Sequence, residues 1–304
     1  MGGEELAAWI ALQTVEGIGA ASLGRLIARF GSARAVLAAS AEELAQVPKV
    51  PGLVLSGVLR AARGLGRAQA IAERLTAEGV LALRPGDPGY PPRLHALGSP
   101  PPLLYVRGRL PHEAKPTFGI VGTTDPSDHG QEIARTVAHR LAAQGWVIVS
   151  GHARGIDAAA HRGALDAQGP TLLVLPTGIL RFRPHPGYPP WGSLWRRAVA
   201  VSEWHPEAPW RTLAALARNR LTAALSDALL VVETRERGGA LSTLRHAIAL
   251  GRRTFVVRFR KPALSAEGNS LAQAAGAQPV GSLRELERLL RHPPRSGRQP
   301  DLPW

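Results

Sequence analysis

The chain has 304 residues, no cysteine, and 37 basic against 23 acidic side chains, which give a formal net charge of +14. The absence of cysteine excludes disulfides, thiol nucleophiles and thiolate metal sites. The longest apolar runs are far shorter than the roughly 18 residues of a membrane span, so we expect a folded cytoplasmic protein without membrane contact.

The basic excess is mainly arginine and is unevenly distributed. Residues 1–80 hold eight basic and seven acidic side chains, so nearly all of the excess falls in residues 81–304. The planar guanidinium of arginine suits phosphate oxygens, and the surplus therefore favours a polyanionic partner. Codon bias toward arginine is the alternative explanation.

The first part of the chain, residues 1–79, is predicted to be a small all-helical domain. Its apolar residues recur at spacings of three and four, as on the buried face of a helix. Within it, Val15-Glu16-Gly17-Ile18-Gly19 resembles the turn of a helix-hairpin-helix, which presents backbone N–H groups to a DNA phosphate.

The second part, residues 80–291, is predicted to be a larger α/β domain. A passage rich in proline and glycine over 85–102 leads into alternating apolar runs and amphipathic segments. This alternation predicts a doubly wound, mostly parallel, Rossmann-like sheet. The predicted strands are 118–121, 146–149, 171–175, 199–201, 228–232 and 254–257, and the predicted helices lie near 130–144, 156–167, 213–225, 240–250 and 283–291. Residues 292–304 are expected to form a flexible tail rich in proline and arginine.

Four segments near the carboxyl ends of the predicted strands have the composition of an anion site. Ligands of doubly wound sheets bind at this edge, where glycine-rich loops lead into helix N-termini. The segments are 122–124, 150–157, 217–220 and 238–243. The residues predicted to bind nucleic acid are Gly122, Thr123, Thr124, Ser150, Gly151, Arg154, Gly155, Arg218, Asn219, Arg220, Gly239 and Thr243.

The roles of the arginines in these segments differ. Arg154 either binds phosphate with two hydrogen bonds or pairs with Asp157 and only orders the turn, and the residues alone leave both readings open. Arg218 and Arg220 are two positions apart on a helix and cannot share a face, so one can reach the pocket while the other braces the fold. His161 is interpreted as a packing residue or a polar contact, and not as a catalytic base.

The sequence holds anion-binding groups without an evident acid, base or nucleophile. We find no His/Asp/Glu grouping with metal-ligand spacing, no Gly-x-Ser-x-Gly and no phosphate-binding loop of the Gly-x-x-x-x-Gly-Lys-Ser/Thr type. We therefore expect a binding site that uses neither cofactor nor metal.

Several of these motifs resemble the DNA-processing protein A family, also called the Smf family. The specific match is Ser150-Gly151-x-Ala153-Arg154-Gly155-Ile156-Asp157 with Ala160-His161, supported by Arg218-Asn219-Arg220 and Val231-Val232-Glu233. The resemblance covers roughly residues 5–290 and implies a helix-hairpin-helix or sterile-alpha-motif-like domain before an extended Rossmann fold. It also implies a homodimer that is not an enzyme, binds and protects single-stranded DNA, and loads the RecA recombinase onto it in natural transformation.

The chain departs from the family pattern at three places. Thr124 stands where the family has an arginine, and Ala215-Leu216 stands where it has an aromatic-proline pair. The segment 181–190 is unusual, and Arg181 and Arg183 within it either compensate for these losses or indicate another ligand. The winged-helix domain of many members is not expected here, and whether the tryptophans at 191, 195, 204 and 210 stack on bases or cover the sheet is left open.

Two other functions remain as alternatives. One is a diverged paralogue with a protein-interaction role only, which Thr124 and the altered segment 181–190 favour. The other is a nucleotide-binding Rossmann enzyme of the phosphoribohydrolase type, whose Pro-Gly-Gly-x-Gly-Thr-x-x-Glu motif has its nearest counterpart at 238–243, with Arg245 following and no glutamate.

Overall fold

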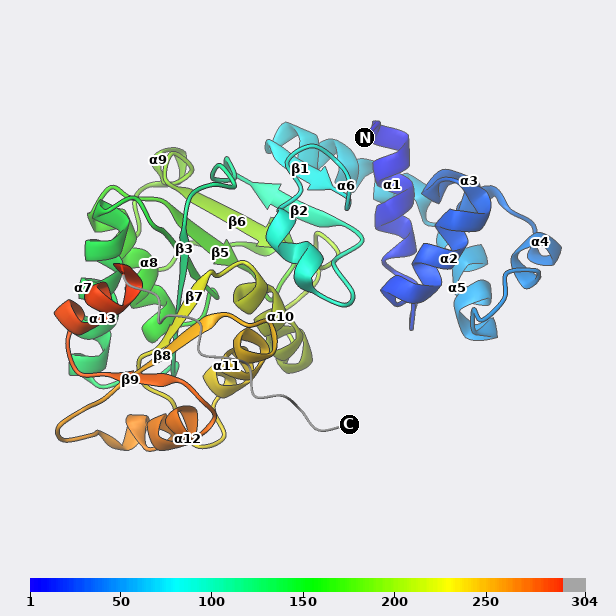
Figure 1. Ribbon diagram of the computed structural model, residues 1–304. Helices are drawn as coiled ribbons and strands as arrows, with labels where there is room; N and C mark the ends of the chain where they lie inside the picture. The colour runs from blue at the N-terminus through cyan, green and yellow to red at the C-terminus, as the bar shows by residue number, and fades with distance from the viewer. Residues whose placement is uncertain (292–304) are drawn as a thin grey trace, which may run out of the picture.

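The computed structural model describes residues 1–291, and it contains a nine-stranded sheet with helices on both faces, beside a bundle of six helices (Figure 1). The predicted α/β class with a mostly parallel sheet is confirmed. The predicted tail, and with it the expectation about a winged-helix domain, lies outside the described residues.

Six helices, which we call the helical unit, precede the sheet. Capping residues mark the ends of several of them. Ser40 and Glu43 form a capping box at one helix start, and Gly31 ends another helix in the left-handed region at φ 85°. The amphipathic spacing places residues such as Leu26, Val36 and Leu75 in a common core. The helices are α1 (Gly3–Leu12), α2 (Ala20–Phe30), α3 (Ala33–Ala38), α4 (Ala41–Ala45), α5 (Gly52–Ala62) and α6 (Leu65–Ala77).

The sheet has the strand order β1-β2-β6-β5-β4-β3-β7-β8-β9. The pairs β1–β2 and β2–β6 are antiparallel, and all other neighbours are parallel. The chain order reverses at β3, which lies between β4 and β7, so the switch point of the sheet is there. The strands are β1 (Val80–Leu83), β2 (Leu104–Arg107), β3 (Thr117–Val121), β4 (Val147–Ser150), β5 (Thr171–Val174), β6 (Ala198–Ser202), β7 (Ala228–Val231), β8 (Arg253–Val257) and β9 (Gln278–Val280).

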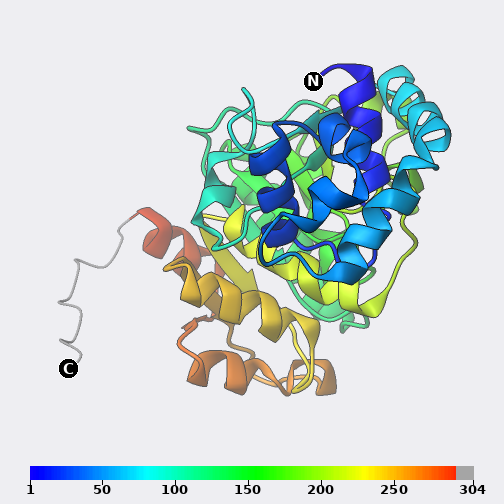
Figure 2. The same ribbon diagram turned by 90° about the vertical axis from the view of Figure 1, so that its right-hand side faces the viewer.

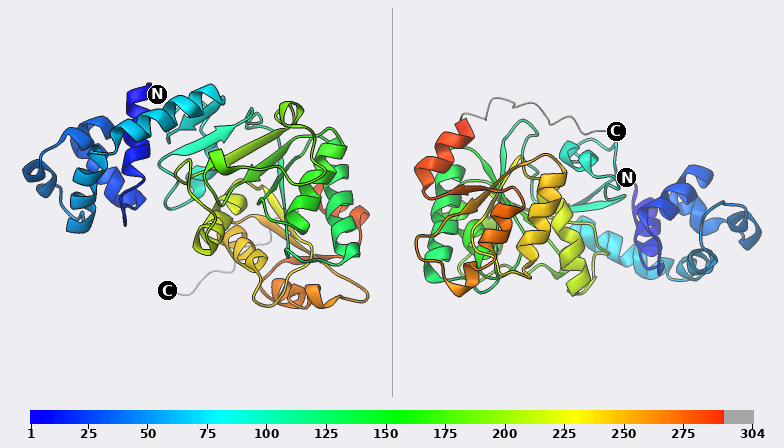
Figure 3. Two further views of the ribbon diagram at one scale, coloured as in Figure 1. Left: turned by 180° about the vertical axis from the view of Figure 1, so that it is seen from behind. Right: turned by 60° about the horizontal axis from the view of Figure 1, so that its bottom comes forward.

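Helices cover the two faces of the sheet (Figures 1 and 3). Successive residues of a strand point to opposite faces, so Ile120 packs under α7 and α8 while Val121 packs against α11. Both faces of the central strands are buried, which explains their continuous apolar runs. The helices are α7 (Asp128–Ala143), α8 (Ile156–Asp166), α9 (Trp191–Leu194), α10 (Thr212–Ala224), α11 (Gly239–Ala249), α12 (Asn269–Ala274) and α13 (Leu283–Arg291), with short 3-10 turns η1 (Pro92–Ala96), η2 (Ile179–Arg181) and η3 (Leu264–Ala266).

The helical unit packs on the antiparallel side of the sheet, and in Figure 2 it faces the viewer. Its core is continuous with sheet residues such as Tyr105, whose hydroxyl donates to Gln13 Oε1 at 2.7 Å. Arg107 of β2 is ion-paired with Glu78, which follows α6. These contacts fix the helical unit against β2, at the antiparallel end of the sheet.

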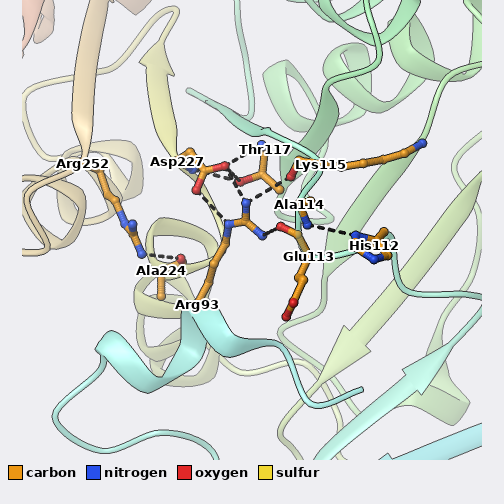
Figure 4. Close-up of polar contacts among 9 residues, drawn as sticks. All are labelled: Arg93, His112, Glu113, Ala114, Lys115, Thr117, Ala224, Asp227 and Arg252. Atoms are coloured by element: carbon orange, nitrogen blue, oxygen red, sulfur yellow. Dashed lines mark hydrogen bonds and ion pairs between the residues drawn. The ribbon is translucent and has the colours of Figure 1, made fainter. Parts of the chain in front are cut away.

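The passage before β2 is clamped to the opposite, amino-terminal edge of the parallel strands (Figure 4). Arg93 of η1 donates from Nε and Nη2 to the two oxygens of Asp227, each at 2.8 Å. Asp227 Oδ2 also accepts from Thr117 N at 2.9 Å and from Thr117 Oγ1 at 3.0 Å. This network is at the end of β3 and β7 away from the predicted site, so we assign Arg93 and Asp227 a structural role.

Candidate functional site

A cleft of about 740 Å³, which we call the strand-end cleft, opens beyond the carboxyl ends of β3, β4 and β7. Its walls come from the loops that follow these strands, from one side of α10 and from the start of α11. Because the chain order reverses at β3, neighbouring connections leave in opposite directions and a crevice forms between them. The cleft is therefore where the strand pattern predicted a site.

Nine of the twelve predicted residues line the strand-end cleft. They are Gly122, Thr123, Thr124, Gly151, Arg154, Arg218, Asn219, Gly239 and Thr243. The segments that contribute them are up to 121 residues apart in sequence, from Gly122 to Thr243, and the sheet brings them to one edge. The predicted grouping of separate segments around one pocket is thus what the fold contains.

The structure does not bring Ser150, Gly155 and Arg220 into this cleft. Ser150 is buried, and its hydroxyl donates to the Ile120 carbonyl at 2.6 Å, so it ties β4 to β3. Gly155 has φ 73°, and a Cβ there would meet the Thr123 carbonyl, so it allows two loops to lie close together. Arg220 is on another face of α10, ion-paired with Glu203.

The floor of the strand-end cleft holds two buried groups of opposite charge, which lie near each other beside Gly151 without forming an ion pair. Arg218 and Asp157 are 6% exposed each, and a Cβ on Gly151 would collide with both side chains. Arg218 donates from Nη1 to the Val174 carbonyl. Burial lowers the pKa of Arg218 and raises the pKa of Asp157, and each charge partly opposes the shift of the other. The floor is polar and, with both groups charged, has no net charge.

The rim of the strand-end cleft is cationic. Arg154 is exposed and has no hydrogen bond or ion pair with any residue of the described range 1–291. Arg235 and Arg237, from the loop between β7 and α11, line the facing side. Arg235 donates to Asp125 at 3.2 Å, an exposed pair that a competing anion can replace at low cost.

These contacts bear on the two readings of Arg154. The carboxylate of Asp157 points to the floor, where Arg218 is its cationic neighbour and the Ala153 amide donates to it at 3.4 Å. No ion pair joins Arg154 to Asp157 in the described part of the chain. The guanidinium of Arg154 is therefore open to a ligand, and the turn is ordered without it.

The unusual segment 181–190 packs against the loop that carries Arg154. His152 Nε2 donates to the Arg183 carbonyl at 2.8 Å, and the ring of His185 lies 4.4 Å from that of His152, measured between centroids. The side chains of Arg181 and Arg183 bond to main-chain carbonyls and do not line the cleft. The segment thus packs against the Arg154 loop and does not supply cations in place of the missing arginine.

His161 is the central polar side chain behind this loop. It is fully buried, donates from Nε2 to the Gly151 carbonyl at 2.6 Å, and has Nδ1 2.7 Å from the Thr171 hydroxyl. Burial lowers the pKa of His161 to about 3, so the ring is neutral at physiological pH. The interpretation as a buried polar contact fits this geometry.

This burial predicts that the fold weakens in mild acid. The unfolded chain binds a proton on His161 near pH 6.5 while the folded chain does not, so stability is full above pH 6.5 and is lost as pH falls toward 3. We expect the free energy of unfolding to be about 2 kcal/mol lower at pH 5 than at pH 7 from this group. Urea unfolding of the wild type and of His161→Gln at both pH values measures it, and an equal pH dependence in the two proteins would contradict the assignment.

Among the lining residues of the strand-end cleft that the sequence prediction missed are three aromatic rings and two arginines. They are His152, His185, Trp210, Arg235 and Arg237. Arg235 and Arg237 had a usable signal, because they lie in a strand-end loop directly before Gly238-Gly239. Trp210 was noted only as one of four tryptophans that either stack on bases or cover the sheet, since no motif marks it in the long connection between β6 and α10 from which it reaches the cleft.

The sequence of the chain is similar to those of known proteins. Residues 81–291 match the family model of DNA recombination-mediator protein A. The chain is 34% identical to Protein Smf of Synechocystis over 84% of its own length and 65% of that protein, and 30% identical to DNA processing protein DprA of Bacillus subtilis over 59% and 61%. The chain thus spans less than two thirds of the length of these relatives.

Two solved structures are similar to the whole or most of the chain. DNA processing protein A from Streptococcus pneumoniae superposes with a TM-score of 0.73 over 93% of this chain and 97% of that one, at 23% identity, which supports the fold. DNA processing protein A from Helicobacter pylori, studied for its single-stranded DNA binding mode, gives a TM-score of 0.60 at 26% identity over 70% of this chain and 96% of that one. None of the helices within residues 1–291 has the length and apolar character needed to cross a membrane.

Proposed function

The chain belongs to the DNA recombination-mediator protein A family, and on this basis we propose that its strand-end cleft binds single-stranded DNA. The observation that carries the proposal is the division of the cleft into a cationic rim and a neutral polar floor. The single-stranded DNA binding mode studied in the Helicobacter pylori relative supports the same ligand class.

The rim suits the phosphates of a strand. Arg154 and Arg237 are exposed, and Arg235 is held only by an exposed carboxylate, so three guanidinium groups can donate to phosphate oxygens without breaking the fold. These contacts also offset the absence of an arginine at Thr124. Such contacts read the backbone and give binding that depends little on base sequence and strongly on salt.

The floor suits the other part of a nucleotide. A phosphate at the floor would lie near the Asp157 carboxylate and be repelled by it. A base or a sugar is uncharged and finds both hydrogen-bond donors and acceptors there. Thr222 adds a buried hydroxyl without a partner in the described range. A base held in a duplex cannot leave its partner to enter, which favours single strands.

An exposed aromatic residue extends the site at its mouth. Trp210 is 61% exposed, and Leu213 and Leu216 of α10 are 79% and 43% exposed beside it. A flat indole at the edge of a cationic cleft is a stacking platform for a base. We propose this role for Trp210 in place of the aromatic-proline pair that the chain lacks before Arg218.

We expect tighter binding to a single strand than to a duplex. Fluorescence anisotropy with a labelled 20-residue oligothymidine, and with a duplex of the same length, measures both affinities across a salt series. The logarithm of the affinity for the single strand should fall with the logarithm of salt concentration by roughly 0.7 for each phosphate contact, hence roughly 2 for three arginines. Equal affinities for the two ligands would contradict the proposal.

We further propose that the protein acts through binding and not through covalent chemistry, as a homodimer that hands the protected strand to RecA. The support for binding is that exposed arginines, which suit phosphate oxygens, form the rim of the cleft, and that its buried carboxylate, Asp157, lies beside the buried guanidinium of Arg218. The family resemblance supports the RecA and homodimer parts. RecA ATPase activity on strands precoated with single-strand-binding protein tests the transfer, and no stimulation by this chain would contradict it.

Of the two alternatives, the diverged paralogue is the second candidate. The observation that favours it is Thr124, which is exposed at the rim and carries no charge. The arginines at 235 and 237 weigh against it. Absence of measurable binding to any single strand would support it.

A further inference from the structure

A second cleft of about 640 Å³ lies between the helical unit and the sheet domain, and we call it the hairpin cleft. One wall is the turn between α1 and α2, and the facing wall comes from α10, α11 and the segment after β6. Ala217 and Arg220 of α10 line it, whereas Arg218 and Asn219 line the strand-end cleft. The two clefts therefore flank α10, which lies on the side of the sheet domain toward the helical unit (Figure 1).

The turn wall presents backbone donors. Gly17 has φ 73°, a conformation that favours glycine, and Gly19 is the residue directly before α2. No side chain caps this helix start, and no acceptor within residues 1–291 takes the amides of Gly19, Ala20 or Ala21. The eleven-residue helix α2 adds the positive end of its dipole.

The facing wall holds polar atoms that the fold does not satisfy. Glu203 Oε1, Trp204 Nε1 and Arg220 Nη1 are buried and have no hydrogen-bond partner in the described range. All three residues line the hairpin cleft, and Glu203 is nine-tenths buried while its ion-pair partner Arg220 is 27% exposed. Buried polar atoms are almost always paired in folded proteins, so three in one wall indicate a place where a ligand or solvent supplies partners.

The chemistry of the two walls differs. The amides of the turn and the start of α2 donate only and suit a phosphate, since Glu203, the sole carboxylate among the lining residues, is neutralised by Arg220. The wall with Glu203, Trp204 and Arg220 offers donors and an acceptor, which suits a base. A nucleotide combines a phosphate with a base, and a cleft of about 640 Å³ is large enough to hold one.

We propose that the hairpin cleft is a second subsite that holds one nucleotide unit of the strand bound in the strand-end cleft. The proposal rests on the proposed function, because the same strand must occupy both sites. Between the clefts, α10 exposes Leu213 and Leu216, an apolar surface on which the bases of the connecting nucleotides can lie. Arg220, predicted to bind nucleic acid, takes part here instead of in the strand-end cleft.

Binding at two linked sites predicts a dependence on strand length. A strand of about six nucleotides fills one cleft, whereas one of about thirty reaches both, and its second contact is intramolecular. Loss of the hairpin cleft should therefore weaken long strands and leave short ones unchanged.

The variant pair Gly19→Asp and Gly19→Asn tests this without threatening the fold. A Cβ at Gly19 meets nothing within 4 Å, its φ of −86° suits any residue, and both Asp and Asn are favourable caps for α2. Gly19→Asp adds a negative charge where the phosphate would bind, while Gly19→Asn has the same shape without charge. Anisotropy with oligothymidines of 6 and 30 residues, together with Arg154→Ala, separates the two sites.

We expect Gly19→Asp to bind the 30-residue strand roughly tenfold more weakly than Gly19→Asn, with the two variants equal on the 6-residue strand. Equal affinities of the two variants at both lengths, with Arg154→Ala still defective, would overturn the hairpin subsite alone. If the wild type binds neither strand, or Arg154→Ala binds both normally, the proposed function fails and the second subsite fails with it.

Discussion

Replacing Arg218 with alanine should lower the free energy of unfolding by about 3–5 kcal/mol. Arg218 is 6% exposed, and its removal leaves the Asp157 carboxylate buried without its cation and the Val174 carbonyl without its donor. Chemical denaturation by urea, followed by circular dichroism at pH 7, measures the loss. A loss below about 1 kcal/mol would contradict the buried pair.

The partner variant provides the internal control. Asp157→Asn removes the buried negative charge, so the double variant with Arg218→Ala should lose less stability than the two single losses added together. Arg162→Ala, which breaks an exposed pair with Asp166, should cost less than about 1 kcal/mol. The comparison also means that weak DNA binding by Arg218→Ala would report on folding as much as on phosphate contacts.

Arg154→Ala should raise the Kd for single-stranded DNA roughly tenfold to a hundredfold while leaving the unfolding free energy within about 0.5 kcal/mol of the wild type. The guanidinium is exposed and unpaired within residues 1–291, so its loss removes a charged donor to phosphate and no fold contact. The salt slope of binding should fall by roughly 0.7, as expected for one phosphate contact.

Arg162→Ala is again the matched control, since Arg162 lies on α8 near the Arg154 loop but lines a different surface. It should bind the strand as the wild type does. Unchanged affinity and salt slope in Arg154→Ala would show that this arginine does not contact the strand.

The sheet was predictable because its strands are buried on both faces. Continuous apolar runs between amphipathic helices, such as 118–121 and 228–232, are typical of buried parallel strands, and the structure places β3 and β7 there. The strands β1, β2 and β9 escaped prediction. β1 and β9 are short, at a sheet edge and partly exposed, so their residues lack a continuous apolar run. β2 is fully buried, but its four residues follow the proline- and glycine-rich passage and end in Arg107.

The candidate site was predictable where loop composition determines it. Glycines and hydroxyls directly after a strand, such as Gly122 and Thr123, line the strand-end cleft by virtue of the topology. Sequence did not reveal which side chains are exposed. Arg218 and Arg154 are the same residue type, yet one is buried beside Asp157 and the other is open to solvent, a difference set by packing between distant segments.

The exposed face of α10 shows the same limit. Helical geometry predicts that Arg218 and Arg220 point in different directions, but it does not predict which of them faces the strand-end cleft. That choice follows from the pairing of Arg220 with Glu203 at the end of β6, a contact across 17 residues of irregular chain and helix.

The central claim, that the strand-end cleft binds single-stranded DNA, is tested most directly by photo-crosslinking with an oligonucleotide that carries 5-iodouracil, followed by mass spectrometry of the protein peptides. We predict crosslinks in peptides that contain Trp210, the 122–125 loop and the 151–157 loop, and we predict their loss when unlabelled single strand is added in excess but not when duplex is added. Crosslinks confined to other surfaces, or competed equally by duplex, would contradict the claim.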